Sequence, residues 1–194
     1  LRSLRNESEL GEESVYGAAT QLSIPEQAFN LSSSANSNLD FSELALQFQA
    51  SLLAWFNNQE DLQAAKNLAV CCSQIGSKNQ DDSSRKVFWV ASVLLQAVAN
   101  GQLKLSNALR NSIVKIDKEV DYINNRIVGE VRKSSPTRLT QELLYFVAQN
   151  YKSSDDLRQV YEVFELEHNI PSASKIEHAR SSLLGRNNAL LQSV

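Results

Sequence analysis

Apolar residues recur at spacings of three and four over most of the chain, which is the pattern of amphipathic helices. The pattern predicts helical segments at residues 40–57, 60–76, 82–100, 106–127, 136–150, 153–166 and 171–184. No stretch alternates convincingly between apolar and polar positions, as a half-buried strand does. We therefore expect an all-α fold, a bundle of about seven helices.

Capping residues mark the ends of several predicted helices. Asp40, followed by Glu43 three residues later, forms a variant of the capping box at the start of the first segment. Gly76 is expected to end the second segment and Gly101 the third, because helices commonly stop at a glycine in the left-handed conformation. Pro136 fits the first turn of the fifth segment, where the missing N–H has no partner to lose.

The distribution of apolar residues around each segment indicates how the helices pack. The third segment is apolar almost all round, which is typical of a central helix. The fourth has a narrow apolar seam, which suits an antiparallel up-down bundle. The expected core includes the aromatic residues Trp55, Phe56, Phe88 and Trp89, and the inward stripe of the second segment, formed by Leu62, Ala65, Leu68, Ala69, Cys72 and Ile75.

Residues 1–38 differ in composition from the rest of the chain. They are rich in Ser, Asn, Glu and Gln, with only short apolar islands such as those at Leu22 and Phe29. We expect a linker or partly disordered segment that docks locally, followed by one helical domain at residues 39–194. Because the chain begins at Leu1 and contains no methionine, we also expect it to be a piece of a longer polypeptide.

Charge and hydropathy exclude two classes of partner. The formal net charge is -3 at pH 7, whereas a general nucleic-acid-binding protein needs a basic face. No apolar run approaches the ~20 residues that cross a bilayer, and no signal-peptide core is present at the N-terminus. The sequence predicts a cytoplasmic protein that neither binds nucleic acid nor inserts into a membrane.

Few residues could support catalysis or metal binding. The two histidines, His168 and His178, flank Pro171 in different predicted helices, and both lie far along the chain from the adjacent Cys71 and Cys72. A zinc site needs such ligands to arrive together, and buried cysteines are more often small core residues. Glycine loops that cradle phosphate are also absent. We expect no metal, no cofactor and no enzymatic activity.

The outward face of the second segment has a further pattern. Rotation by 100° per residue places Lys66, Val70 and Ser73 together on that face. The stretch "AKNLAVCCSQIG", residues 65–76, resembles the motif of histidine phosphotransfer (Hpt) domains, which runs Ala-His-x-Leu-Lys-Gly-Ser/Ala and closes with a hydrophobic–Gly pair. In those domains an exposed histidine carries the phosphoryl group and the glycine one turn later admits the partner.

The three functional positions of that motif are all substituted in this chain. Lys66 stands in the histidine position, Ala69 in the lysine position and Val70 in the glycine position. A protonated lysine is no phosphoacceptor in this exchange, and Val70 would crowd the approach of a kinase or receiver. The resemblance therefore implies a degenerate phosphotransfer site at Lys66, Ala69 and Val70.

The order of later segments extends the resemblance over roughly residues 40–194. An aromatic-rich helix, a glycine stop and a long helix with "KIDKEV" are followed by "ELLYFVA", "VYEVFEL" and "ARSSLLGRNNALLQSV". This order resembles the N-terminal Hpt-like region of the ChpA/PilL group of CheA-type hybrid kinases, and the related FimL scaffold proteins. The resemblance implies a non-catalytic interaction module whose partners are proteins of a type IV pilus chemosensory complex that governs twitching motility.

Two alternatives remain open from the sequence. One is active phosphotransfer through another histidine, for which His178 in "KIEHARSSLL" is the better candidate, while His168 fits the end of the sixth helix. The other is a helical adaptor unrelated to Hpt domains. An Hpt descendant should place residues 42–127 in an up-down antiparallel bundle with Lys66 exposed near the middle of its helix.

Overall fold

The protein is a helical bundle. The computed structural model describes residues 17–25, 28–29, 39–58, 61–125 and 135–169. The helices in these ranges are α2 (Phe41–Asn57), α3 (Leu62–Lys78), α4 (Asp82–Ala99), α5 (Asn107–Asn125), α6 (Pro136–Asn150), α7 (Asp155–Val163) and α8 (Leu166–Asn169), with short 3-10 turns η2 (Ala19–Gln21) and η5 (Tyr151–Ser153). No strand occurs in these ranges, so the all-α prediction is confirmed.

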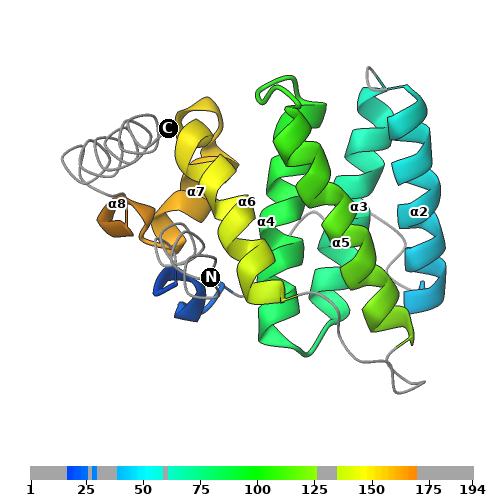
Figure 1. Cartoon of the computed structure of the whole chain (residues 1–194), viewed down its shortest axis with the longest axis horizontal. Coiled ribbons are helices and arrows are strands. Elements are labelled where there is room, and N and C mark those ends of the chain that lie inside the picture. The colour runs from blue at the N-terminus through cyan, green and yellow to red at the C-terminus, as the bar shows by residue number, and fades with distance from the viewer. Residues whose placement is uncertain (1–16, 26–27, 30–38, 59–60, 126–134, 170–194) are drawn as a thin grey trace, which may run out of the picture.

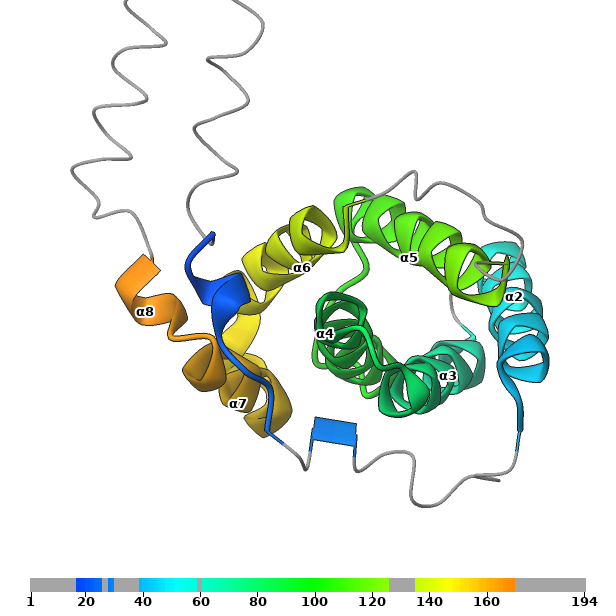
Figure 2. The same cartoon turned by 90° about the horizontal axis from the view of Figure 1, so that it is seen from below.

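Helix α4 lies at the centre of the molecule, as its all-round apolar pattern predicts. Its main packing partners are α3 and α6, and it also contacts α5 and α7. Figure 2 shows these helices arranged around α4, with α2 at the outer edge between α3 and α5. Trp89 on α4 is 2% exposed and lies with its ring centroid 5.6 Å from that of the buried Phe164, so α4 also anchors the end of α7.

Helices α2 to α5 run alternately up and down (Figure 1). Helix α2 packs on both α3 and α5, which closes the four helices into a bundle. The capping box at the start of α2 is formed as predicted: Asp40 Oδ1 accepts from Glu43 N at 2.8 Å, and Glu43 Oε2 accepts from Asp40 N at 3.0 Å. Ser135 caps α6, and Pro136 occupies its first turn.

Two predicted helix ends differ in the structure. Helix α3 continues through Gly76 to Lys78, so the prediction that Gly76 ends it is wrong. The glycine instead permits close packing, because a Cβ at this position would collide with the ring of Phe29 and lie 3.0 Å from Phe88 Cβ. Gly101 does follow the end of α4, with a φ of 71°.

The predicted sixth helix is divided into two. Helix α7 ends at Val163, Glu165 adopts a left-handed conformation with a φ of 47°, and α8 begins at Leu166. The break is stabilised by burial of the Phe164 side chain, which is fully enclosed. The seventh predicted helix, residues 171–184, lies outside the described residues.

An N-terminal strap, which we define as residues 17–25 and 28–29, packs on α3 and α4. Ala19 and Phe29 are 1% and 7% exposed and belong to the core. Lys86 of α4 donates a hydrogen bond to Thr20 O at 2.8 Å and pairs with Asp82 one turn earlier. The guanidinium of Arg85 lies 5.6 Å from the centroid of the Phe29 ring. The strap is thus held by both apolar and polar contacts.

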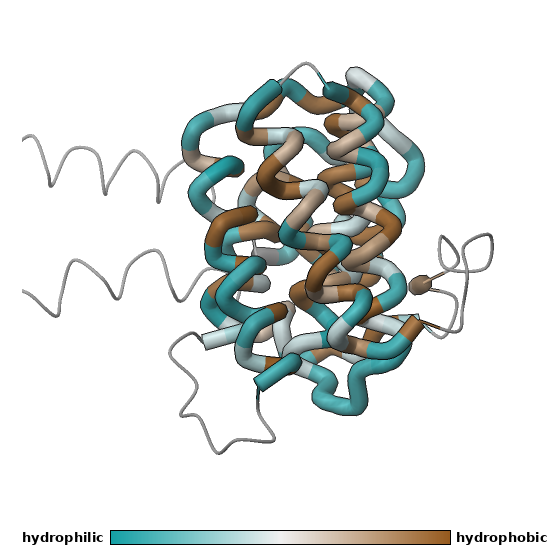
Figure 3. Tube along the Cα trace, turned by 90° about the vertical axis from the view of Figure 1, so that its right-hand side faces the viewer, coloured by the Kyte–Doolittle hydropathy of each residue, from teal (hydrophilic) through white to brown (hydrophobic). Residues whose placement is uncertain are grey.

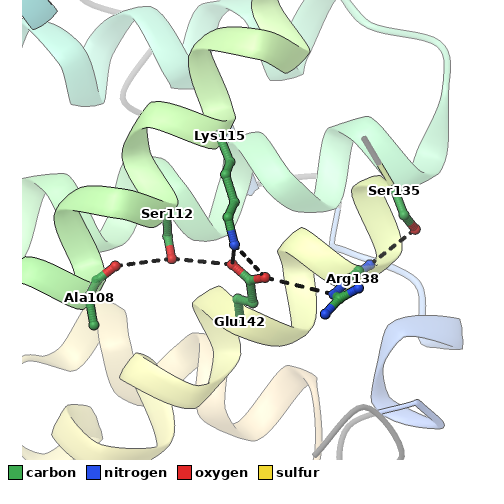
Figure 4. A network of polar contacts seen from close by, with 6 residues as sticks. All are labelled: Ala108, Ser112, Lys115, Ser135, Arg138 and Glu142. Carbon is green, nitrogen blue, oxygen red and sulfur yellow. Dashed lines mark hydrogen bonds and ion pairs between the residues drawn. The ribbon is translucent and has the colours of Figure 1, made fainter. Parts of the chain in front are cut away.

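A polar network joins α5 to α6 on the other side of α4 (Figure 4). Lys115 Nζ lies 2.7 and 2.6 Å from the two carboxylate oxygens of Glu142. The Ser112 hydroxyl is 3.4 Å from the same carboxylate, and Arg138 Nε approaches it to 4.0 Å. Such partly exposed pairs contribute up to about 1 kcal/mol each, so the network positions α6 more than it stabilises the fold.

Candidate functional site

The residues of the predicted degenerate site occupy different depths on α3. Lys66 is exposed and Val70 is half-buried, but Ala69 is fully buried and belongs to the core. Lys66 lies on the surface in the second turn of α3, with Val70 one turn later on the same side. The expectation that Lys66 stands near the middle of its helix is therefore wrong, because α3 begins at Leu62 and continues to Lys78. Ala69 contributes packing against the neighbouring helices and presents nothing to solvent.

Two expectations about the faces of α3 are wrong. Ser73, expected beside Lys66 and Val70 on the outward face, is fully buried because the strap covers this part of the helix. Its hydroxyl lies 3.4 Å from Phe29 O, to which it donates a weak hydrogen bond. Leu62, expected in the core, is 51% exposed because it lies in the first turn of α3, at the edge of the bundle.

An open groove of about 370 Å³ runs between α2 and α3 beside Val70. Its lining residues are Gln47, Ala50 and Ser51 from α2, and Asn67, Val70 and Cys71 from α3. The groove is lined without charged side chains, so it offers amide and hydroxyl groups beside apolar carbon. This chemistry suits contact with the surface of another protein more than the binding of an ionic substrate.

The adjacent cysteines are buried, and their thiols have low reactivity. Burial raises the pKa of the Cys71 thiol from 9.0 to about 11, and it raises the pKa of Cys72 well above 9.0. The thiolate is the reactive form of cysteine. Cys71 thus lines the groove as a protonated thiol at neutral pH, in keeping with the prediction that both residues are small core side chains.

The remaining candidates lie elsewhere or cannot be placed. His168 is an exposed residue of the short α8, and His178 lies outside the described residues. Across the described ranges, no three His, Cys, Asp or Glu side chains gather in a way that could hold a metal ion. Among the helices described, none combines the length and the apolar character needed to cross a bilayer.

The chain matches a known protein family. The family described as the FimL scaffold protein second domain matches residues 34–177, which is most of the chain. The chain belongs to this FimL family. No match was found among curated proteins or among solved structures. As a FimL second domain it is a module of a scaffold protein, and the FimL part of the resemblance seen in the sequence is confirmed.

The FimL match begins after the strap. Residues 17–29 precede position 34, yet Ala19 and Phe29 are part of the core. The folded unit of this FimL domain is therefore longer at its N-terminus than the matched region.

Sequence reasoning missed the contribution of α2 to the groove. Ala50 and Ser51 carry no chemical signature, and their position depends on how α2 packs on α3. A signal was nevertheless present in α2: Leu46 and Leu53 fall outside the apolar stripe that faces the core, and both are exposed. Apolar residues out of phase with the core stripe indicate a second contact surface.

Proposed function

We propose that the chain is a non-catalytic interaction module of a type IV pilus chemosensory pathway, descended from an Hpt domain that has lost its phosphorylation site. Membership of the FimL scaffold family supports a role in holding protein partners together. The observation that carries the proposal is the exposed Lys66 in the histidine position of α3, within the up-down bundle of α2 to α5.

The chemistry of the three substituted positions supports a scaffold over a phosphotransfer protein. The ammonium of a lysine side chain has no free electron pair to accept a phosphoryl group. Val70 fills the position one turn later, where an Hpt domain keeps glycine to admit its partner, and Ala69 is buried beyond reach of any ligand. The chain retains the helical frame of such a domain without its acceptor.

The groove between α2 and α3 is the proposed contact surface for a protein of the pathway. Val70 and Ala50 would give apolar contact, and the side chains of Gln47 and Asn67 would supply hydrogen bonds at its sides. Protein–protein interfaces combine these two kinds of contact. We expect Val70→Arg to abolish co-purification of the partner, and Tyr145→Arg on the exposed face of α6 to leave it unchanged.

A phosphotransfer assay tests the absence of relay activity. The chain is incubated with an active CheA-type kinase and, separately, with a phosphorylated receiver domain, and labelled phosphate on the chain is counted. We expect no incorporation. Acid-labile, base-stable phosphate on the chain would overturn the proposal, and its loss in His178→Gln would then assign the activity to that residue.

A variant that restores the motif separates an Hpt descendant from an unrelated adaptor. We expect Lys66→His combined with Val70→Gly to accept phosphate from a phosphorylated receiver, because the histidine would stand exposed with space beside it. Lys66→His alone should accept much less, since Val70 still crowds the site. Equal and negligible labelling of both variants would favour the unrelated adaptor.

A further inference from the structure

The solvent-facing side of α2 carries an apolar stripe that no part of the described chain covers. Leu46 and Leu53 are 67% and 64% exposed, the highest values among the large apolar side chains of the described residues. Ala50 lies between them and Asn57 follows, both exposed. The four residues are spaced four, three and four apart, which is the spacing of a coiled-coil seam. We call Leu46, Ala50, Leu53 and Asn57 the α2 stripe.

The exposed face of α2 is also nearly free of charge. A helix at the surface of a globular protein normally places charged residues on its solvent side. Glu43 is the one charged residue in α2, and its carboxylate is engaged in the capping box at the N-terminal end. The stripe is therefore a neutral, largely apolar surface about 17 Å long. It lies on α2, on the side of the bundle that faces the viewer in Figure 3.

Contacts between α2 and α5 place charged side chains of α5 beside the stripe. Gln49 Nε2 donates to Asp121 Oδ1 at 2.9 Å, and the guanidinium of Arg110 lies 5.9 Å from the centroid of the Phe56 ring. An acidic group thus lies beside the middle of α2 and a basic group beside its last turn. The same edge of α5 adds the exposed Val114 between them.

We propose that the α2 stripe binds the α2 stripe of a second copy of this chain, with the two helices antiparallel. The stripe alternates large and small residues, and antiparallel pairing places Ala50 opposite the Leu53 of the second copy, and Leu53 opposite its Ala50. Leu53 of each copy then fills the space above Ala50 of the other, and Leu46 lies opposite Asn57 of the second copy. A parallel pair would set Ala50 against Ala50 and leave a gap.

The flanking charges favour the same arrangement. The two-fold axis of an antiparallel pair passes midway between Ala50 and Leu53 and reverses the direction of α2. This reversal brings Asp121 of one copy towards Arg110 of the other, at two points along the edge of the contact on which both α5 helices lie. Opposite charges thus face each other twice, which favours this orientation.

The size of the contact predicts a reversible dimer. A pair of single helices with short flanking contacts lies at the low end of specific interfaces, below about 1,200 Å² of total buried area. The net charge of -3 on each copy adds only weak repulsion at physiological salt. We expect association in the micromolar range. Ala50 also lines the groove proposed as the contact surface for a pathway protein, so the dimer and that complex would compete for this residue.

Sedimentation equilibrium on the 194-residue chain tests the proposal. The average mass of the wild-type chain should rise from monomer to dimer with concentration. Leu46→Glu with Leu53→Glu should weaken the dimer at least about tenfold, because two charges would be buried at its centre. Tyr145→Glu, which alters a half-exposed residue on α6, should dimerise like wild type. Circular dichroism should show that all variants keep their helix content.

A cross-linking experiment tests the orientation. A short bis-maleimide should join Ala50→Cys chains to Leu53→Cys chains when the two are mixed, and should join neither variant to itself as efficiently. Homotypic Ala50→Cys dimers would indicate a parallel pair and overturn the antiparallel geometry. A wild-type chain that stays monomeric up to several hundred micromolar overturns the proposal altogether, and the stripe would then be open to a different protein.

Discussion

Gly76 and Phe29, far apart in the chain, meet where the strap crosses α3. The ring of Phe29 occupies the space that a side chain at position 76 would need, and Phe88 lies close on the other side. A glycine within a helix costs about 1 kcal/mol relative to alanine, and here that cost is offset by the packing of an aromatic ring. Single-residue changes at this contact therefore affect the whole N-terminal region.

We expect Gly76→Ala to lower the free energy of unfolding by about 1–3 kcal/mol, because overpacking outweighs the gain in helix propensity. Urea denaturation measures the change. In a Phe29→Ala background the same substitution should cost much less, since the ring is gone. Equal costs in both backgrounds would show that the two residues do not interact.

The reactivity of Cys71 is a second prediction at this scale. Burial raises the pKa of its thiol to about 11, so the thiolate fraction at pH 8 is about 100-fold below that of a thiol with a pKa of 9.0. We expect iodoacetamide to label the folded chain correspondingly slowly and the urea-unfolded chain rapidly. The raised pKa also implies that stability is fully present below pH 9 and falls as the pH rises towards and past 11.

The exposure of Lys66 could be predicted from the sequence, whereas the burial of Ser73 could not. Both follow from the same helical rotation, which places them on one side of α3. Periodicity reports which side of a helix is polar, but it cannot show that a distant segment, here the strap with Phe29, lies across part of that side. The partial burial of Val70 likewise depends on α2, which packs beside α3 and cannot be placed from periodicity.

At the scale of elements, helix positions were predicted well and some ends poorly. The start of α2 followed from its capping box and the start of α6 from Pro136 in its first turn, and both signals act locally. The break between α7 and α8 had no such signal, because Glu165 takes a left-handed conformation usually reserved for glycine or asparagine. Burial of Phe164 against Trp89 supplies the energy that holds the break, and that contact is not local in sequence.

We expect Glu165→Gly to raise the free energy of unfolding by about 0.5–1 kcal/mol, because glycine adopts this conformation without strain. Gln159→Gly, at an exposed position inside α7, should lower it by about 1 kcal/mol. Thermal unfolding of the two variants makes the comparison. Destabilisation by both would show that the side chain of Glu165 contributes more than its backbone strain costs.

The contact between α2 and α5 contains an acidic pair with a pH dependence. Burial, and then the neighbouring Asp121, raise the pKa of Asp117 above 3.8. Its carboxyl holds a proton to higher pH in the folded chain than in the unfolded chain, so its contribution to stability is lost as pH rises through the folded pKa. We expect Asp117→Asn to raise the unfolding midpoint at pH 7 and to have little effect at pH 3. A midpoint that falls at pH 7 would contradict this assignment.

At the scale of the whole molecule, the all-α class and the central place of α4 were predicted from the sequence. The apolar pattern of α4 is a property of that segment alone, so it requires no knowledge of its neighbours. The groove and the α2 stripe arise only when helices are placed together. The boundary between residues 38 and 39 stays a prediction, although the strap places side chains of the earlier segment in the core.

Truncation tests how far the folded unit extends. We expect a chain that begins at residue 30 to lose about 2–4 kcal/mol of unfolding free energy, because it lacks the buried Phe29 and Ala19 and leaves Lys86 without its contact to Thr20. A chain that begins at residue 17 keeps the strap and serves as the control. Equal urea midpoints for the two would show that the strap does not belong to the folded unit.

The central position of α4 has a consequence for the synthesis of the protein. When α4 leaves the ribosome, α2 and α3 are already present, but α6 and α7 have not yet been made. The side of α4 that packs on α6 then stays exposed to solvent until about fifty further residues have been added. At typical elongation rates of about 5–20 residues per second this takes several seconds. During that interval the nascent chain presents the kind of surface that chaperones bind, so production of this domain should depend on chaperone supply more strongly than its final stability suggests.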